Sequence, residues 1–337
     1  MKILSCVKPY ELRYLESPVP QIPPGHALIK IKRVGVCGTD LHAFEGKQPY
    51  FNYPRVLGHE LSGDVAELNG VSDFKPGEAV TIIPYFNCGN CGACSVGKYN
   101  CCVRLKVCGV HQDGGLAEYL VVPISSLVYG QGLGYDELAL IEPFAIGAHA
   151  VNRAGINSDD TVLVMGAGPI GMACITFAKQ SGAKVIVADR NAFRLNFCTT
   201  VLGADLVINI ETEDALALLN DYTNGQMPSV IMDATGNLAA INSGFNYMAH
   251  GGKYVLVGLQ GGDISFSHPE FHKREGILMS SRNALRADFD QVLASVVSGS
   301  VQLHSFITHR LNFVEVVSKF SLLLSPSENV VKAIVIL

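Results

Sequence analysis

The hydrophobic pattern of the chain changes near residue 137. Before about residue 125, short runs rich in β-branched residues lie between glycine- and proline-containing turns; these runs are HALIKIKRVGV (26–36), GDVAEL (63–68) and EAVTIIPY (78–85). Short strands at this spacing are typical of a compact β-rich unit. The segment ELALIEPFAIGAHAVNRA (137–154) then has the apolar periodicity of a helix. We therefore expect a β-rich region followed by a helix.

Between residues 161 and 260, apolar runs alternate with segments of helix length. The runs are TVLVMG (161–166), KVIVAD (184–189), DLVIN (205–209), SVIMDA (229–234) and KYVLVG (253–258). Buried apolar strands separated by helices predict βαβ units in a parallel sheet. Further on, DFDQVLASVVSG (288–299) is amphipathic and VVKAIVIL (330–337) resembles a strand. The expected fold class is α/β, with a β-rich domain beside a doubly wound parallel sheet.

The composition restricts the possible partners. The chain has 337 residues, of which 48% are hydrophobic and 16% charged, and its formal net charge is −5. The charges are interspersed without a long basic run, which argues against nucleic acid and anionic membrane as partners. No apolar stretch approaches the ~20 residues of a membrane span, and the N-terminus does not resemble a secretory leader. We expect a cytoplasmic protein, where clustered cysteines indicate metal binding rather than disulfides.

A glycine-rich motif follows the first strand of the expected parallel sheet. Gly166-x-Gly168-x-x-Gly171 opens a helix, and Asp189 ends the next strand. The glycines allow a tight turn, close approach of the backbone to a pyrophosphate, and close helix–strand packing. The helix N-terminus offers N–H groups to that pyrophosphate. We assign further cofactor contacts to Ile170, Arg194, Val257 and Leu259.

The acidic residue of this motif favours NAD over NADP. Asp189 would accept hydrogen bonds from both ribose hydroxyls, and its charge would repel a 2′-phosphate. Arg190 and Arg194 follow closely and could soften that preference. NAD is therefore the expected cofactor, with NADP as the alternative.

Three potential metal ligands are scattered through the first half of the chain. Cys37 lies in VGVCGTDLH, His59 with Glu60 in VLGHELSG, and Glu142 in LIEPFA. Taken singly, each has an ordinary structural explanation: a small buried thiol, a core histidine, or an acid at a helix N-terminus. Only their combination points to a site.

That combination resembles a known family. CGTDLH, GHE, the cysteine cluster CGNCGACSVGKYNCC (88–102), and GAGPIG with Asp189 occur in the order and spacing of the zinc-dependent medium-chain dehydrogenases, especially the sorbitol and threonine dehydrogenase branch. The resemblance covers essentially the whole chain. It implies a catalytic zinc held by Cys37 and His59, with Glu60 and Glu142 competing for the remaining protein ligand. Such a zinc acts as a Lewis acid on an alcohol.

The resemblance also implies how a proton leaves the site. Thr39 and His42 correspond to a relay through a hydroxyl and an imidazole, and Glu60 is assigned to the catalytic machinery with them. A surface or supporting role for His42 is the alternative. Asp40 is expected to orient its neighbours.

The cysteine cluster is similar to the family's structural zinc lobe. The implied ligands are Cys88, Cys91, Cys94 and Cys102, with Cys101 as the alternative fourth ligand. Four thiolates close a tetrahedral site, which leaves no position for substrate. Such a site contributes to folding instead of catalysis. Cys108, just downstream, is expected to be a buried thiol.

Three further stretches resemble the bacterial sugar-acid members of this branch: PRVLGHE (54–60), GVHQDGG (109–115) and SSRNA (280–284). They imply oxidation of a secondary alcohol of a polyol or sugar acid, with a hexonate such as L-galactonate favoured. Arg282 would contact substrate and Phe86 would line its pocket. Alternatives are another polyol, a hydroxy amino acid, a zinc-free quinone reductase, or a non-catalytic sensor that retains the fold.

The same resemblance implies the domain organisation and partners. A GroES-like catalytic domain would comprise residues 1–147 and 286–337, with the zinc lobe at 86–104. A Rossmann domain would comprise residues 148–285. Two zinc ions per chain and a homodimer or homotetramer are expected.

Overall fold

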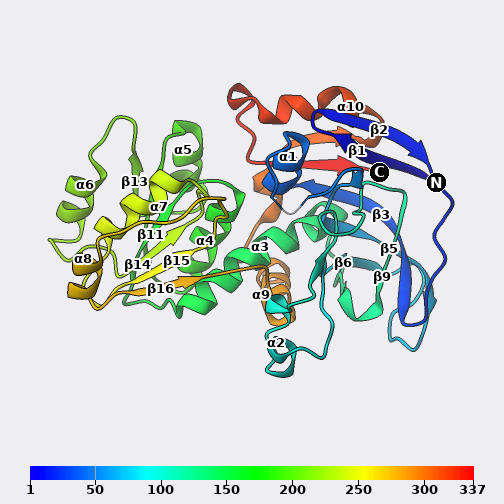
Figure 1. Ribbon diagram of the computed structural model, residues 1–337, viewed down its shortest axis with the longest axis horizontal. Coiled ribbons are helices and arrows are strands. Elements are labelled where there is room, and N and C mark those ends of the chain that lie inside the picture. The colour runs from blue at the N-terminus through cyan, green and yellow to red at the C-terminus, as the bar shows by residue number, and fades with distance from the viewer. Residues whose placement is uncertain (50) are drawn as a thin grey trace. The chain divides into compact units, whose positions relative to one another are not determined.

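The chain forms two compact units, which are coloured by residue number in Figure 1. The structure is a computed structural model, and it describes residues 1–49 and 51–337. Unit 1 comprises Met1–Glu142 and Leu285–Leu337, and unit 2 comprises Pro143–Ala284. Among the described residues, no helix is both long enough and apolar enough to cross a membrane.

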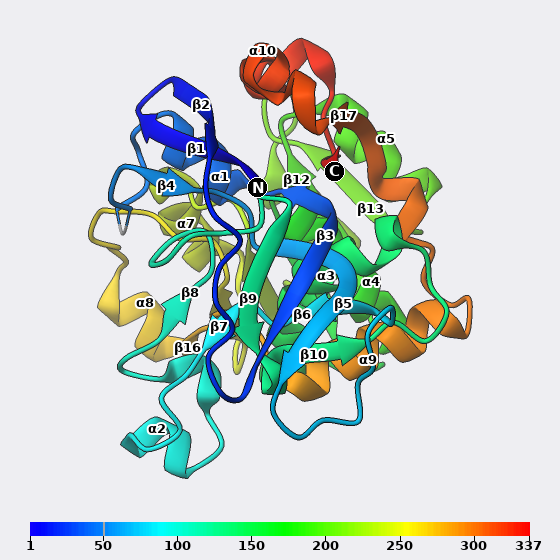
Figure 2. The same ribbon diagram turned by 90° about the vertical axis from the view of Figure 1, so that its right-hand side faces the viewer.

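Unit 1 is built on a largely antiparallel sheet. Its strands are β3 (His26–Val36), β5 (Glu60–Asn69), β6 (Ala79–Ile82), β9 (Tyr119–Pro123), β10 (Leu127–Tyr129), β17 (Ile307–Asn312) and β18 (Lys332–Ile336). They follow the order β10-β6-β5-β3-β18-β17, and β9 also pairs with β3 (Figure 2). The C-terminal strand β18 thus lies beside β3, which brings residues from the two ends of the chain together.

Smaller elements surround this sheet. The strands are β1 (Lys2–Lys8), β2 (Glu11–Glu16), β4 (Arg55–Val56), β7 (Tyr85–Phe86) and β8 (Lys106–Val107), and the helices are α1 (Gly38–Phe44), α2 (Gly92–Ser95), α9 (Arg286–Val297) and α10 (Val316–Lys319). Helix α3 (Tyr135–Ala154) runs from unit 1 into unit 2. In both ribbon views the lobe around α2 projects from the rest of unit 1 (Figures 1 and 2).

Unit 2 contains the expected parallel sheet. Its strands are β11 (Thr161–Met165), β12 (Lys184–Asp189), β13 (Leu206–Asn209), β14 (Val230–Asp233), β15 (Lys253–Leu256) and β16 (Ile277–Ser280). They follow the order β13-β12-β11-β14-β15-β16, and the paired strands are parallel. The helices are α4 (Pro169–Gln180), α5 (Ala192–Thr200), α6 (Ala215–Tyr222), α7 (Leu238–Gly244) and α8 (His268–Lys273).

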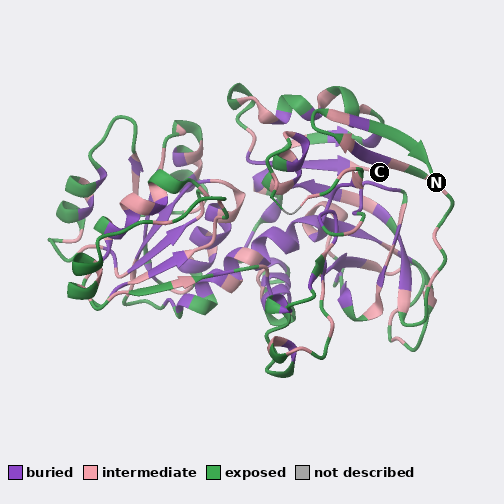
Figure 3. Ribbon diagram, viewed as in Figure 1, coloured by how far each residue is buried: buried purple, intermediate pink, exposed green. Residues whose placement is uncertain are grey.

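Burial explains why the parallel strands are uniformly apolar. Strands β11, β12 and β14 are almost entirely buried, and β15 is buried at its two central residues (Figure 3). A β-rich unit and a second unit with a parallel sheet confirm the expected α/β fold class. The edge strand β16 was not expected, because its apolar run is only three residues long, residues 277–279.

Candidate metal centres and cofactor site

Three candidate ligands meet where β3 ends and β5 begins. Cys37 follows β3 directly and caps the N-terminus of α1, while His59 precedes β5 and Glu60 is its first residue. One donor atom from each of Cys37, His59 and Glu60 lies within 4.8 Å of the other two. Pairing of β3 with β5, which sets Gly35 opposite Glu60, produces this convergence.

Asp40 contacts the backbone around these ligands. Its carboxylate accepts the backbone N–H of Cys37 at 2.9 Å and that of Gly58 at 3.1 Å. His59 Nδ1 lies 3.8 Å from Asp40 Oδ1. Burial lowers the pKa of His59, but the negative charges of Asp40 and Cys37 outweigh burial and raise it overall. Asp40 therefore fixes both the backbone and the charge around the site.

The two candidate carboxylates have different partners. Both oxygens of Glu60 accept the ammonium of buried Lys332, at 2.6 and 2.7 Å. Glu142 lies within α3, away from its N-terminus, and its Oε1 accepts the hydroxyl of Tyr85. Burial raises the pKa of the Glu142 carboxyl to about 7, the charge of His59 opposes this shift, and that of Glu60 adds to it.

The residues present fit a zinc ion. Among the described residues, His59 Nδ1 and Glu142 Oε2 are buried without a hydrogen-bond partner. Buried polar atoms are nearly always paired, so these two atoms indicate that the group of residues can take a further partner. Sulfur, imidazole nitrogen and carboxylate oxygen are the donors that zinc prefers.

The second cluster consists of cysteines only. One sulfur each from Cys88, Cys91, Cys94 and Cys102 lies within 4.8 Å of the other three. The Cys88–Cys102 and Cys91–Cys94 sulfur pairs are 3.4 and 3.5 Å apart. Four sulfurs around one zinc at ~2.3 Å lie about 3.8 Å apart, so these free thiols fit a zinc cage.

Neighbouring groups already favour a thiolate in this cage. The backbone N–H of Asn90 and the guanidinium of Arg104 lower the pKa of Cys88 to about 5. Cys101 is exposed and lies outside the four-sulfur group, whereas Cys102 is buried within it. Cys108 is fully buried, and burial raises the pKa of its thiol to about 12.

The glycine-rich loop has the shape required for a dinucleotide. Gly166 adopts a φ of +96°, and a Cβ at Gly171 would collide with the Gly166 carbonyl. A Cβ at Gly168, the N-cap of α4, would meet open space. The first and third glycines are therefore needed for the turn and its packing, and the second leaves room beside the helix N-terminus for an anion.

The other assigned cofactor residues lie near the carboxyl ends of the parallel strands. Asp189 ends β12 and accepts the backbone N–H groups of Ala167 at 2.6 Å and Asn191 at 2.8 Å. Its carboxylate has lone pairs left for ribose hydroxyls. Val257 donates its N–H to the Asp233 carbonyl, which ties the loop after β15 to that after β14. The assigned cofactor residues also include Ile170 and Arg194, which are half-buried, and Leu259, which is exposed.

The remaining predicted residues are divided between the units. Thr39 is half-buried and His42 exposed on α1, and Phe86 packs partly buried against the core of unit 1. Arg282 is exposed in unit 2. Sequence reasoning missed Lys332 and Tyr85; a lone lysine inside the apolar run VVKAIVIL was the signal available for the first.

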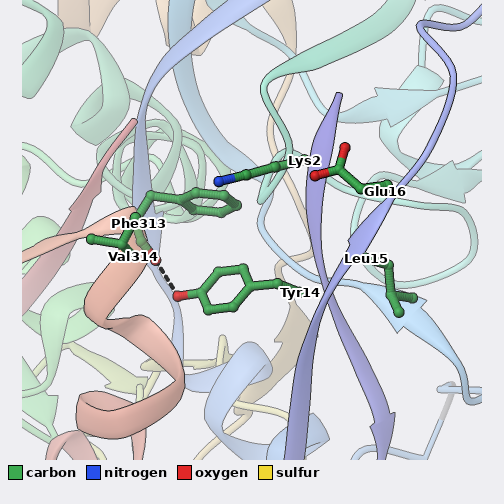
Figure 4. Close-up of a pocket in the computed structure, with 6 residues that line it drawn as sticks. All are labelled: Lys2, Tyr14, Leu15, Glu16, Phe313 and Val314. Carbon is green, nitrogen blue, oxygen red and sulfur yellow. Dashed lines mark hydrogen bonds between the residues drawn. The ribbon is translucent and has the colours of Figure 1, made fainter.

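One surface hollow in unit 1 is lined by residues other than the candidate metal ligands. About 300 Å³ in volume, it is lined by Lys2, Tyr14, Leu15, Glu16, Phe313 and Val314 (Figure 4). Tyr14 donates its hydroxyl to the Phe313 carbonyl there. None of the candidate ligands lines this hollow, so it is separate from the metal chemistry.

Two protein-family models match the chain. The alcohol dehydrogenase GroES-like domain matches residues 23–131, and the zinc-binding dehydrogenase domain matches residues 169–298. The chain belongs to the zinc-containing medium-chain alcohol dehydrogenase family. It is a zinc-dependent NAD(P) alcohol and polyol dehydrogenase.

Individual relatives cover nearly the whole chain. The L-galactonate-5-dehydrogenase of Escherichia coli K12 is 45% identical and covers 93% of this chain and 92% of its own. A sorbitol dehydrogenase of Halalkalibacterium halodurans is 33% identical, with 89% of both chains covered. The crystal structure of an alcohol dehydrogenase (rspB) of E. coli CFT073 with NADH has a TM-score of 0.93 and 32% identity, and covers 100% and 99% of the two chains.

Proposed function

We propose that the protein oxidises a secondary alcohol of a hexonate, L-galactonate or a close analogue, with NAD as the hydride acceptor. The 45% identity to L-galactonate-5-dehydrogenase over 93% of the chain carries this proposal. The reaction removes a hydride from the carbinol carbon to nicotinamide C4 and a proton from its hydroxyl, and yields a ketone, NADH and a proton.

Cys37, His59 and Glu142 would hold the catalytic zinc, with Glu60 beside them. The donor atoms of Cys37, His59 and Glu60 lie within 4.8 Å of one another, and Glu142 enters the assignment through its buried, unpaired Oε2. Zinc bound there supplies Lewis-acid chemistry that favours loss of the hydroxyl proton. Thr39 would receive that proton and His42, exposed on the same helix, would release it to solvent.

The cysteine cage would hold a second zinc with a structural role. Cys88, Cys91, Cys94 and Cys102 leave no open position for substrate. The catalytic domain would comprise residues 1–147 and 286–337 with its lobe at 86–104, and the cofactor domain residues 148–285.

The cofactor would lie at the carboxyl edge of the parallel sheet. The N-terminus of α4 would bind the pyrophosphate, and Asp189 would accept the ribose hydroxyls. Gly166, Gly168, Ile170, Gly171, Arg194, Val257 and Leu259 would complete the site. The NADH in the rspB structure supports NAD as a cofactor, and the preference over NADP rests on Asp189.

Substrate and assembly are open to direct measurement. Arg282 would bind the substrate carboxylate or a diol, because a guanidinium forms two hydrogen bonds to either, and Phe86 would line the pocket. A homodimer or homotetramer is also proposed, since Ile277 and Leu278 are exposed on the edge strand β16. Light scattering tests the assembly.

A screen of NAD reduction over hexonates and polyols, with metal quantification, tests the function. We expect turnover on L-galactonate to exceed that on sorbitol, with two zinc ions per chain. Turnover on sorbitol without turnover on L-galactonate would show that the substrate is a polyol and not a hexonate. Bound zinc without turnover on any alcohol would instead favour a non-catalytic sensor.

A further inference from the structure

Lys332 is a buried cation in an otherwise apolar strand. It opens β18 and is only 3% exposed. Its ammonium donates to Glu60 Oε1 at 2.6 Å, to Glu60 Oε2 at 2.7 Å and to the Val36 carbonyl at 3.2 Å. A buried charge is tolerated only when it is paired and hydrogen-bonded. All three ammonium donors are used here, so the pair is a built feature of the fold.

Three adjacent strands place this pair at the candidate catalytic zinc site. Val36 precedes Cys37, and Glu60 follows His59, so the ammonium contacts the immediate neighbours of both ligands. The strand register places Glu60 of β5 opposite Gly35 of β3. A Cβ at Gly35 would collide with Glu60 Oε2. The carboxylate therefore occupies a cradle that only glycine leaves open.

The site has more donors than a catalytic zinc can use. Such a zinc takes three protein ligands and keeps one position open. Cys37, His59, Glu60 and Glu142 would together fill all four positions. Glu60 has an oxygen within 4.8 Å of the Cys37 and His59 donors, but both of its oxygens accept the Lys332 ammonium. Glu142 lies outside that 4.8 Å group, and its Oε2 has no hydrogen-bond partner among the described residues.

We propose that Lys332 is a positioning residue that holds Glu60 out of zinc coordination. The position that Glu60 would otherwise take then stays open for the substrate alcohol. The inference rests on the proposed zinc site, but it does not depend on which alcohol is the substrate. It assigns a role to a residue near the C-terminus, far in sequence from every candidate ligand.

Lys332→Met tests the proposal by removing the ammonium while keeping a linear apolar side chain. The readouts are zinc content, the visible spectrum of the cobalt(II)-substituted protein, which depends on the metal's ligands, and steady-state kinetics. We expect both metals to stay bound and the cobalt spectrum to change as Glu60 coordinates the metal. The value of kcat should fall roughly 10- to 100-fold, the range typical of groups that orient metal ligands, and KM should change less. Lys332→Arg should restore spectrum and kcat, because a guanidinium binds both carboxylate oxygens.

If the Lys332→Met protein fails to fold, a double variant still tests the proposal. It combines Glu60→Gln with Lys332→Met, so that both members of the buried ion pair become neutral. We expect this double variant to bind two metals with a cobalt spectrum like that of the unaltered protein. Loss of the catalytic-site metal in the double variant would show that Glu60 is an obligatory ligand and overturn the proposal. So would a folded Lys332→Met protein with unchanged spectrum and kcat.

A matched control separates this effect from the loss of any buried lysine contact. Lys253 opens β15 and its ammonium donates to the Ala154 carbonyl. Lys253→Met should leave metal content, cobalt spectrum and kcat unchanged, and an equal spectral change there would contradict the proposal. Metal content and spectrum need no substrate, so a wrong hexonate assignment would appear only in the kinetics.

Discussion

The cysteine lobe and the site at Cys37 use similar ligand chemistry in opposite ways. The lobe takes its four sulfurs from residues 88–102, and all four face one another. The other site draws its donors from the end of β3, the start of β5 and the middle of α3, and two of its buried polar atoms have no partner among the residues that the structure describes. A dense set of ligands closes a metal site, whereas a sparse set leaves capacity for a substrate. We therefore do not expect the reactive centre to lie where the candidate ligands are closest together in the sequence.

The variant Cys37→Ser should have the largest effect, because it removes a ligand of the proposed catalytic site and leaves the cysteine lobe intact. We expect kcat/KM to fall about 1,000-fold or more, because a metal Lewis acid supplies several kcal/mol of transition-state stabilisation. Zinc content should fall to the one ion of the lobe, and circular dichroism should stay unchanged. A fully active Cys37→Ser protein would show that the chemistry lies elsewhere.

The converse variant, Cys94→Ser, removes one of the two buried sulfurs of the lobe. We expect loss of the lobe zinc and a melting temperature lower by about 5–10 °C, as for a few kcal/mol of lost stability. Turnover of the protein that remains folded should change less than about threefold, since the lobe takes no part in chemistry. A drop in kcat as large as that of Cys37→Ser, at a temperature where the fold persists, would refute the division of roles.

A smaller effect is expected for Tyr85→Phe. The lost hydroxyl donates to Glu142 and lowers the pKa of that carboxyl, so its removal should raise this pKa above about 7. Protons then compete better with zinc for the deprotonated carboxylate. Competition with a chelator should show zinc affinity about 10-fold weaker near pH 6.5, with the deficit shrinking near pH 8.5, where Glu142 is ionised in both proteins. A deficit independent of pH would contradict a role through Glu142.

The smallest effect should come from Cys101→Ser. Cys101 is exposed and lies outside the four-sulfur group. We expect zinc content and turnover to stay unchanged and the melting temperature to shift by less than about 1 °C, since a surface substitution rarely exceeds ±0.5 kcal/mol. Loss of one zinc would instead make Cys101 the fourth ligand of the cage.

Locally encoded features could be predicted from the sequence. The cage follows from cysteine spacing, and the dinucleotide loop from three glycines, of which the turn and its packing require Gly166 and Gly171. The apolar runs of the parallel sheet predicted β11–β15, because strands buried on both faces must be apolar. The family resemblance added the pairing of distant motifs, which spacing alone does not give.

Features set by tertiary register could not be predicted. Lys332 meets Glu60 only because β18 and β5 both flank β3, and Tyr85 meets Glu142 only through the packing around α3. These contacts decide which carboxylate has a free oxygen, so the sequence left Glu60 and Glu142 as equal candidates. The exposed edge strand β16, Ile277–Ser280, has an apolar run too short to be recognised.

Stepwise removal of zinc by a chelator tests the division of roles most directly. Released zinc, NAD reduction and melting temperature would be followed on the same sample. We expect turnover to disappear with one equivalent of zinc and the melting temperature to fall with the other. Loss of turnover and of thermal stability with the same single equivalent would contradict the separation of a reactive site from a structural cage.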